Sequence, residues 1–104
     1  MNTENWTRVC VLDDIPPQGS RVLAWRGGDI ALFRTHDDQV FALLDRCPHK
    51  GGPLSQGMVH GRAVACPLHG WNIDLASGEA LAPDAGCARR FAARLENDEV
   101  WLAL

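Results

Sequence analysis

Two segments share one pattern: Cys47-Pro48-His49-Lys50-Gly51-Gly52-Pro53 and Cys66-Pro67-Leu68-His69-Gly70. Each contains one cysteine and one histidine, spaced Cys-x-His and, after sixteen intervening residues, Cys-x-x-His. A thiolate and an imidazole so close in sequence can reach one centre only where the backbone turns sharply, and glycine and proline permit such turns. We therefore predict two loops of fixed shape, each presenting one sulfur and one nitrogen ligand.

The ligand types indicate a metal centre, and the loops limit its kind. Two sulfur and two nitrogen ligands suit either a tetrahedral zinc ion or the [2Fe–2S] cluster in which two histidines replace two cysteines on one iron. Zinc fingers usually pair cysteine with cysteine and place their histidines on a helix. Here each loop holds one of each, and its prolines and glycines exclude a helix. The pattern favours a binuclear cluster, with Cys47 and Cys66 on one iron and His49 and His69 on the other.

The whole chain has the size and composition of one small globular domain. It has 104 residues, 46% of them hydrophobic, and a formal net charge of −3. The acidic balance argues against nucleic-acid binding, and no apolar stretch approaches the ~18 residues of a membrane span. The first residues, Met1 to Trp6, lack the basic and apolar regions of a signal peptide. We expect a cytoplasmic protein that binds neither nucleic acid nor membrane and keeps its cysteines reduced.

Turn signals recur at the spacing that is typical of an all-β domain. Gly27-Gly28 suits the positive φ of a tight hairpin, and Asn97-Asp98 closes another. Residues 87–96 include good helix formers, yet Phe91, Ala93 and Leu95 alternate along them as on the buried face of a strand, which we favour. The expected strands are Trp6–Leu12, Arg21–Arg26, Asp29–Thr35, Val40–Asp45, Arg62–Ala65, Trp71–Leu75, Cys87–Glu96 and Glu99–Leu104.

The two loops resemble the cluster loops of Rieske proteins, and the flanking residues narrow the resemblance. From about Trp6 to Leu104 the chain is similar to the small subunit of assimilatory NAD(P)H-dependent nitrite reductase. The similar stretches are 31–34, Cys47-Pro48-His49-Lys50-Gly51-Gly52-Pro53-Leu54-Ser55, Gly57-Met58-Val59-His60-Gly61, Cys66-Pro67-Leu68-His69, Ser77-Gly78-Glu79-Ala80 and Pro83-Asp84-Ala85-Gly86-Cys87. The chain departs at Gly70, where that subunit commonly has asparagine, and at residues 89–93, which lack a common Tyr-Pro pair. Neither departure affects a ligand.

The resemblance implies a fold and a cofactor. The fold is the all-β Rieske fold, a single domain over residues 1–104 with an antiparallel β-sandwich base and a small inserted cluster-binding lobe at about residues 45–81. The cofactor is a Rieske-type [2Fe–2S] cluster, and its implied ligands are Cys47, His49, Cys66 and His69. The residues implied to surround the cluster are Pro48, Lys50, Gly51, Pro67, Leu68, Gly70, Trp71 and Pro83.

The resemblance also implies a function and a partner. We expect the chain to transfer single electrons, without catalysing a reaction alone, within an oxidoreductase that reduces nitrite to ammonium in nitrate assimilation. The implied partner is a large nitrite reductase subunit that carries flavin, iron–sulfur and siroheme groups. One alternative is a free Rieske-type ferredoxin that supplies electrons to an aromatic-ring dioxygenase and shares all four ligands. Another is a structural or regulatory subunit in which the metal, zinc included, only holds the loops together.

Residues outside the ligand set have simpler interpretations. Cys10 and Cys87 are expected to be small buried core residues, and His60 to lie at the surface or beside the loops without binding metal. Trp71 directly follows the second loop and is expected to shield the metal site. Lys50 is either a solvated charge or a docking point for an acidic partner. Three further tryptophans are expected in the core: Trp6, Trp25 and Trp101.

Overall fold

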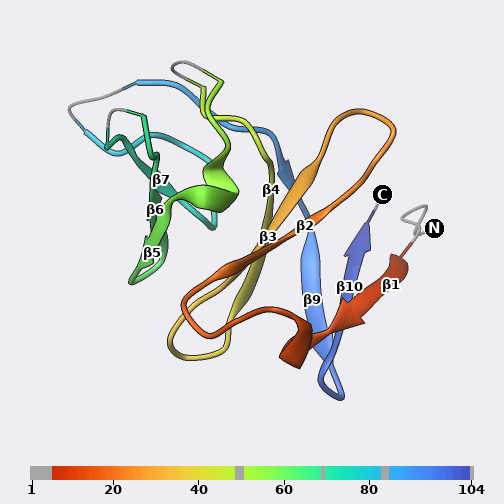
Figure 1. The fold of residues 1–104 in the computed structure, drawn as a ribbon. Coiled ribbons are helices and arrows are strands. Elements are labelled where there is room, and N and C mark those ends of the chain that lie inside the picture. Colours follow the sequence, from red (N-terminus) through yellow and green to blue (C-terminus); the bar gives the residue numbers. More distant parts are fainter. Residues whose placement is uncertain (1–5, 49–50, 69, 83–84, 104) are drawn as a thin grey trace.

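The computed structural model describes residues 6–48, 51–68, 70–82 and 85–103, which form three antiparallel sheets (Figure 1). The strands are β1 (Trp6–Val11), β2 (Ser20–Leu23), β3 (Ile30–Arg34), β4 (Val40–Leu44), β5 (Met58–His60), β6 (Ala63–Ala65), β7 (Asn72–Asp74), β8 (Arg90–Phe91), β9 (Ala93–Glu96) and β10 (Glu99–Ala103). Two short 3₁₀ helices, η1 (Leu12–Asp14) and η2 (Leu54–Gln56), accompany them. None of the helices in these ranges has the length and apolar character needed to cross a membrane. The predicted all-β class is confirmed.

Two of the sheets form a sandwich around one of the two cores. One sheet has the strand order β1-β10-β9, and the other has the order β2-β3-β4-β8. Buried side chains from both sheets pack together, and removing this apolar surface from water drives the sandwich to form. The core consists of Cys10, Leu12, Ile15, Ile30, Leu32, Val40, Ala42, Phe91, Val100 and Leu102. The predicted antiparallel β-sandwich is therefore present.

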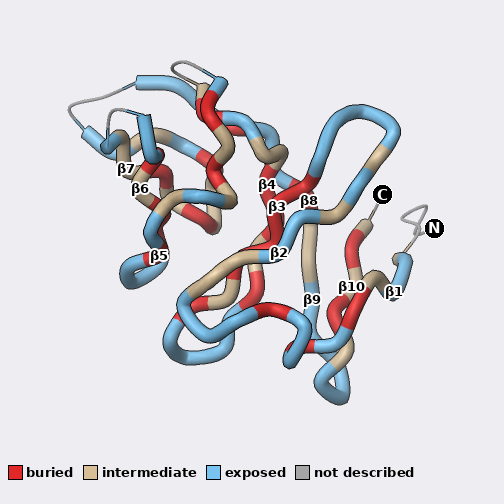
Figure 2. Tube along the Cα trace, in the orientation of Figure 1, coloured by how far each residue is buried: buried red, intermediate tan, exposed pale blue. Residues whose placement is uncertain are grey.

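The third sheet, in the order β5-β6-β7, packs on the other face of the four-stranded sheet (Figure 2). Strand β3 shows the arrangement, because successive residues of a strand point to opposite faces. Ile30 and Leu32 belong to the sandwich core, whereas Ala31 and Phe33 belong to a second core shared with β5, β6 and β7. The four-stranded sheet is thus a middle layer, and a strand covered on both faces is buried without alternation.

Both predicted hairpins are present, but only the one at Asn97 and Asp98 has the tight turn that the sequence predicts. Strands β2 and β3 pair in antiparallel register, but the six residues 24–29 connect them, and of the predicted glycine pair only Gly28 has a positive φ, +121°. Strands β9 and β10 pair on either side of Asn97 and Asp98, with φ values of +51° and +62°. Two successive positive φ angles are the requirement of a type I′ turn, whose twist matches that of the flanking strands.

Residues 87–96 are extended as predicted, but they do not form one strand. The segment breaks at Ala92 into β8, which pairs with β4, and β9, which pairs with β10. The chain therefore passes from one sheet of the sandwich to the other, and Leu95, predicted on the buried face, is exposed. Strand β5 is missing from the sequence prediction, because three residues are too few to show a period.

The prediction that three tryptophans lie in the core is wrong, since each is only partly buried. Trp25 packs against the sandwich core from its edge. Trp6 and Trp101 lie on the outer face of the sheet β1-β10-β9, with the Arg94 guanidinium 4.4 Å and 6.0 Å from their ring centroids. The pleat explains this position, because both sequence neighbours of Trp101 face the core and successive side chains alternate.

Candidate metal centre

The first cysteine–histidine loop, loop 1 (residues 47–52), follows β4. The amide N–H of Cys47 donates a hydrogen bond to the carbonyl of Gly52 at 2.8 Å. The N–H of Gly51 donates to the carbonyl of Cys47 at 2.9 Å. Gly51 has φ +73°, in the left-handed region that glycine enters without steric cost. These two hydrogen bonds close the loop around its cysteine.

The second loop, loop 2 (residues 66–71), connects β6 to β7 and repeats the geometry of loop 1. The N–H of Cys66 donates to the carbonyl of Trp71 at 2.7 Å, and the N–H of Gly70 donates to the carbonyl of Cys66 at 2.9 Å. Gly70 has φ +71°, close to the angle at Gly51. The two cysteines therefore occupy equivalent positions in two loops of the same build, as the repeated sequence pattern predicts.

Both cysteine side chains are buried, and the loops that carry them are in contact. Cys47 is 2% exposed and Cys66 is 3% exposed, and both belong to the second core. A Cβ on Gly52 would lie 2.7 Å from Cδ1 of Leu68 and 3.7 Å from Sγ of Cys66. Glycine at position 52 thus allows the backbone of loop 1 to reach the side chains of loop 2.

Four of the predicted site residues lie outside the described residues, and their interpretation rests on the sequence: His49, Lys50, His69 and Pro83. The other residues predicted to surround the cluster divide by exposure. Those that are exposed are Gly51, Pro67, Leu68 and Gly70, and those that are partly buried are Pro48 and Trp71. In each loop, therefore, the cysteine is buried and some of the described residues that follow the cysteine are exposed.

A third segment, residues 85–88, lies along the flank of loop 1. A Cβ on Gly86 would lie 3.2 Å from Cβ of Pro48 and 3.7 Å from a ring carbon of Trp71. The N–H of Ala80 donates to the carbonyl of Gly86 at 2.8 Å and ties this segment to the chain that follows β7. Gly86 thus brings the backbone against residues of both loops. The resemblance noted from the sequence includes the stretch 83–87, but it assigns Gly86 no contact with the loops.

One carboxylate fixes the chain at the base of loop 1 and another holds the turn that follows β7, and the sequence alone reveals neither. The carboxylate of Asp45 accepts hydrogen bonds from the N–H and the hydroxyl of Ser55, both at 2.7 Å. The hydroxyl of Ser20 donates to the carbonyl of Ser55 at 2.6 Å. Beyond loop 2, Asp74 accepts from the N–H and the hydroxyl of Ser77 at 2.9 Å and 2.8 Å. Hydrogen bonds to a carboxylate acceptor are stronger than those between neutral groups, so the base of loop 1 and the turn after β7 are both held firmly.

The sequence predicts the exposure of Cys10 and His60 correctly and that of Cys87 wrongly. Cys10 is buried as predicted, and burial raises the pKa of its thiol. Cys87 is exposed, contrary to prediction, because Ala88 beside it takes the buried position in this extended segment. His60 is exposed as predicted, and its Nε2 hydrogen-bonds with Oδ1 of Asn72 at 2.8 Å.

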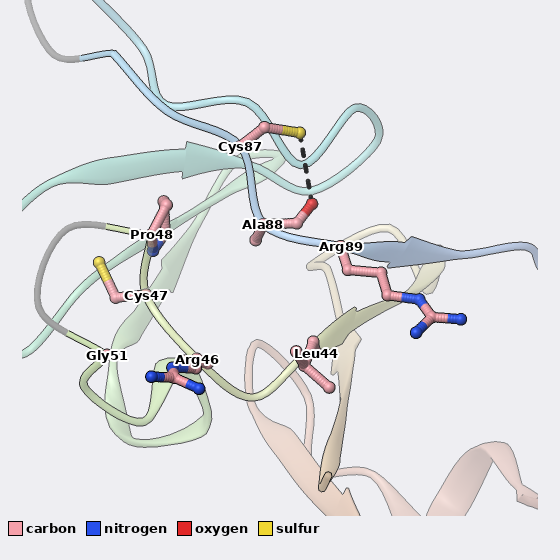
Figure 3. Close-up of a pocket in the computed structure, with 8 residues that line it drawn as sticks. All are labelled: Leu44, Arg46, Cys47, Pro48, Gly51, Cys87, Ala88 and Arg89. Carbon is pink, nitrogen blue, oxygen red and sulfur yellow. Dashed lines mark hydrogen bonds between the residues drawn. The ribbon is translucent and has the colours of Figure 1, made fainter. Parts of the chain in front are cut away.

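An open groove lies beside loop 1, between that loop and the segment that carries Cys87 (Figure 3). We call it the arginine groove. The described residues that line it are Leu44, Arg46, Cys47, Pro48, Gly51, Cys87, Ala88 and Arg89. Two of these eight are positively charged, and none of the eight is acidic. The groove therefore places positive charge next to a buried cysteine of the candidate centre.

The described residues fit a metal centre that binds through sulfur. Two buried thiols are brought to equivalent positions on contacting loops, and thiolates are the ligands of iron–sulfur clusters. Cys47 and Cys66 could hold one metal atom, and each loop has a histidine two or three residues further along the sequence. The mixed donor set is the one expected of a cluster with cysteines on one iron and histidines on the other.

Comparisons with known proteins identify a matching family and several relatives. Residues 5–92 match the family model of the Rieske [2Fe-2S] domain. The chain is 31% identical, over 98% of its own length and 98% of the other, to the ferredoxin component of the naphthalene 1,2-dioxygenase/salicylate 5-hydroxylase systems of Ralstonia sp. It is 51% identical over 59 residues to a 4beta-methylsterol monooxygenase of Methylococcus capsulatus, a match that covers 57% of this chain and spans only 16% of that protein.

A solved structure of similar length gives a further comparison. The crystal structure of a protein assigned as the small subunit of an NADPH nitrite reductase superposes with a TM-score of 0.84 and 28% sequence identity. The match covers 96% of this chain and 99% of that one. The similarity therefore includes both the β-sandwich and the sheet that carries loop 2.

Proposed function

The chain belongs to the Rieske [2Fe–2S] family, and from this membership we propose that it is the electron-transferring small subunit of an assimilatory NAD(P)H nitrite reductase. The Rieske domain implies a Rieske-type [2Fe–2S] cluster, which takes up and releases one electron at a time when bound. Rieske proteins work with larger oxidoreductase or oxygenase components. The proposal assigns electron transfer to this chain and nitrite reduction to a large flavin- and siroheme-containing subunit in the cytoplasm.

Four residues would hold the cluster in this proposal: Cys47, His49, Cys66 and His69. The matching hydrogen bonds of loops 1 and 2 support it, because they give the two cysteines equivalent backbone surroundings. The burial of both thiols keeps water away from the sulfur side of the site. Neutral imidazoles in place of two thiolates leave the site less negative, and Rieske centres accordingly have higher potentials than all-cysteine clusters.

The exposure of the loop ends is the observation that carries the electron-transfer proposal. Leu68 in loop 2 is 52% exposed, and Leu81, which precedes the third segment, is 43% exposed. Exposed apolar side chains beside a redox site provide a surface that a partner can cover. Because the cysteines of the same loops are buried, the site combines a dry interior with an accessible edge. A metal that served only to hold the loops together would not need that edge.

The flanking residues and the structural comparison support the nitrite reductase assignment. The stretches around the loops resemble those of the nitrite reductase small subunit, and the 28% identical neighbour of that assignment matches this chain over nearly its full length. The second candidate function is that of a ferredoxin for an aromatic-ring dioxygenase. It is favoured by the 31% identity to the Ralstonia ferredoxin component, again over nearly the full length of both chains.

Deletion and purification from the native organism test the proposal. The deletion strain should fail to grow on nitrite as sole nitrogen source and should grow normally on ammonium. The tagged chain should be recovered with a siroheme protein that reduces nitrite with NADH or NADPH. Normal growth on nitrite, together with recovery of a flavin reductase and a ring-hydroxylating oxygenase, would replace this assignment with the ferredoxin function. A colourless chain with bound zinc that is needed only for assembly would favour the structural role.

A further inference from the structure

Two positively charged side chains line the arginine groove, Arg46 directly before loop 1 and Arg89 directly before β8 (Figure 3). Within the described part of the chain, neither guanidinium has a carboxylate partner. The chain as a whole carries a net charge of −3, so the groove is a local concentration of positive charge on an acidic protein. Such a groove is suited to bind negatively charged groups.

Among the described residues, three of the seven arginines outside the groove pair with a carboxylate. The three pairs are Arg8 with Glu99 at 3.6 Å, Arg34 with Asp38 at 2.9 Å, and Arg94 with Glu96 at 3.1 Å. The two arginines of the groove lack such a pair although they lie beside a partly enclosed surface. Their charge is therefore not neutralised within the described part of the fold, and an external anion can neutralise it.

Arg89 is held in place by its neighbours. Its guanidinium carbon lies 5.0 Å from the ring centroid of Trp25 and 5.0 Å from that of Phe91. Its backbone carbonyl accepts a hydrogen bond from the N–H of Leu44 at 2.7 Å. A guanidinium that is already held by aromatic rings loses less conformational freedom when it binds a carboxylate. Arg89 is thus preorganised as a binding group.

Arg46 connects the groove to the metal loop. Its Nε would lie 3.3 Å from a Cβ placed on Gly51, so the arginine stem packs along the part of loop 1 that lacks side chains. Cys47, the next residue, also lines the groove while remaining almost fully buried. A group bound in the groove against Arg46 therefore lies directly beside loop 1.

We infer that the arginine groove docks an acidic peptide segment of the redox partner, with carboxylates that bind Arg46 and Arg89. Guanidinium binds carboxylate through two parallel hydrogen bonds, which fix orientation as well as affinity. Two partly exposed apolar lining residues accompany the charges, and a peptide would cover them where a small anion would not: Leu44 and Pro48. The inference rests on the proposed function and adds the chemistry of the partner surface that meets the side of loop 1.

The thiol of Cys87 reports directly on the groove, because it is exposed and is one of the lining residues. Its rate of modification by N-ethylmaleimide is measured by mass spectrometry in the cluster-loaded protein, alone and with the nitrite reductase large subunit of the same organism. We expect modification to be at least about tenfold slower in the complex at low ionic strength, and the protection to weaken in high salt. A complex that forms without protecting Cys87 would overturn the inference.

Matched charge variants test the two arginines. The double variant Arg46→Gln/Arg89→Gln changes the net charge from −3 to −5, and the control Arg8→Gln/Arg21→Gln on β1 and β2 makes the same change. The groove variant should weaken binding by at least about tenfold, mainly through slower association, and the control by less than about twofold. Arg46→Lys/Arg89→Lys keeps the charge and should restore most of the association rate. Equal losses in groove and control variants would refute the inference.

A hexaglutamate peptide separates failure of the groove from failure of the proposed function. The peptide should slow modification of Cys87 in the wild-type protein but not in Arg46→Gln/Arg89→Gln, whichever partner is correct. If the large subunit does not bind while the peptide protects Cys87, the proposed function is wrong and the groove assignment stands. Three results would overturn the assignment. Inorganic phosphate at equal charge could protect Cys87 as well as the peptide does, or protection of Cys87 could rise with the concentration of the chain alone. The third result is that the peptide gives no protection.

Discussion

Replacing Gly52 with alanine should destabilise the protein through one identifiable contact, the side chain of Leu68. A Cβ at position 52 would lie 2.7 Å from Cδ1 and 2.8 Å from Cγ of Leu68. Carbon atoms in favourable contact are about 3.5–4.0 Å apart, so the leucine must move by about 1 Å. Because Leu68 is 52% exposed, its side chain can rotate toward solvent. The nearby Sγ of Cys66, at 3.7 Å, is at an ordinary contact distance and need not move.

The size of the effect follows from this freedom to rotate. Inserting a methyl group into a packed region costs about 1–3 kcal/mol, and the exposure of Leu68 places Gly52→Ala near the lower end, about 1 kcal/mol. In a domain of this size, about 1 kcal/mol lowers Tm by about 4–8 °C. In a Leu68→Ala background the obstructing atoms are absent, and the same substitution should cost less than about 0.5 kcal/mol. The difference between the costs in the two backgrounds measures the coupling between the two sites.

Four cluster-loaded proteins complete this cycle: the wild type, the two single variants and the double variant. Thermal midpoints are measured by circular dichroism at one scan rate, with visible absorbance as a check that each protein carries equal amounts of cluster. A smaller decrease in Tm for Gly52→Ala when Leu68 is already alanine would support the contact between loops 1 and 2. An equal decrease in both backgrounds would refute it, because the cost would then arise from the backbone or from another neighbour.

Further expected results concern the ligands, the loop supports and the free cysteines. Cys47→Ser, like substitution of any other proposed ligand, should yield a colourless protein, which visible absorbance and iron analysis would detect; an unchanged spectrum would remove that residue from the ligand set. Gly57→Ala should lower stability by more than about 3 kcal/mol, measured as a lower Tm or as loss of soluble protein. A Cβ at position 57 would lie 2.1 Å from the carbonyl oxygen of Ala65, and the backbone cannot rotate away as a side chain can. Maleimide should modify exposed Cys87 at least about tenfold faster than buried Cys10. Because burial raises the pKa of the Cys10 thiol, the folded state favours the neutral thiol, and this contribution to stability should be lost as pH rises above the pKa that Cys10 has in the unfolded chain. Equal rates for the two thiols would contradict the burial of Cys10.

The loops were the part of the molecule most open to prediction from sequence, and the reason is local. Glycine and proline restrict the backbone within a few residues, so the repeated cysteine–histidine pattern around Gly51 and Gly70 indicates two similar loops before any tertiary contact is known. The two-residue turn at Asn97 and Asp98 is local in the same way, and the structure contains it with the expected positive φ angles.

Features that depend on tertiary packing were not predictable from the pattern. The break at Ala92 arises because β8 and β9 pair with strands of different sheets, and nothing in the alternation of residues 87–96 records that change of partner. Cys87 is exposed and Trp101 faces outward because of the register of their strands or bridges, although both residue types favour the interior. The arginine groove joins Arg46 and Arg89, which are more than forty positions apart in the sequence.

Nitrogen-resolved EPR of the dithionite-reduced protein tests most directly whether two cysteines and two histidines hold one [2Fe–2S] cluster. We predict a rhombic signal from the reduced cluster with hyperfine couplings to two histidine nitrogens. A protein that gives no such signal and contains zinc without iron or sulfide would contradict the proposal, and so would an iron–sulfur signal without nitrogen couplings.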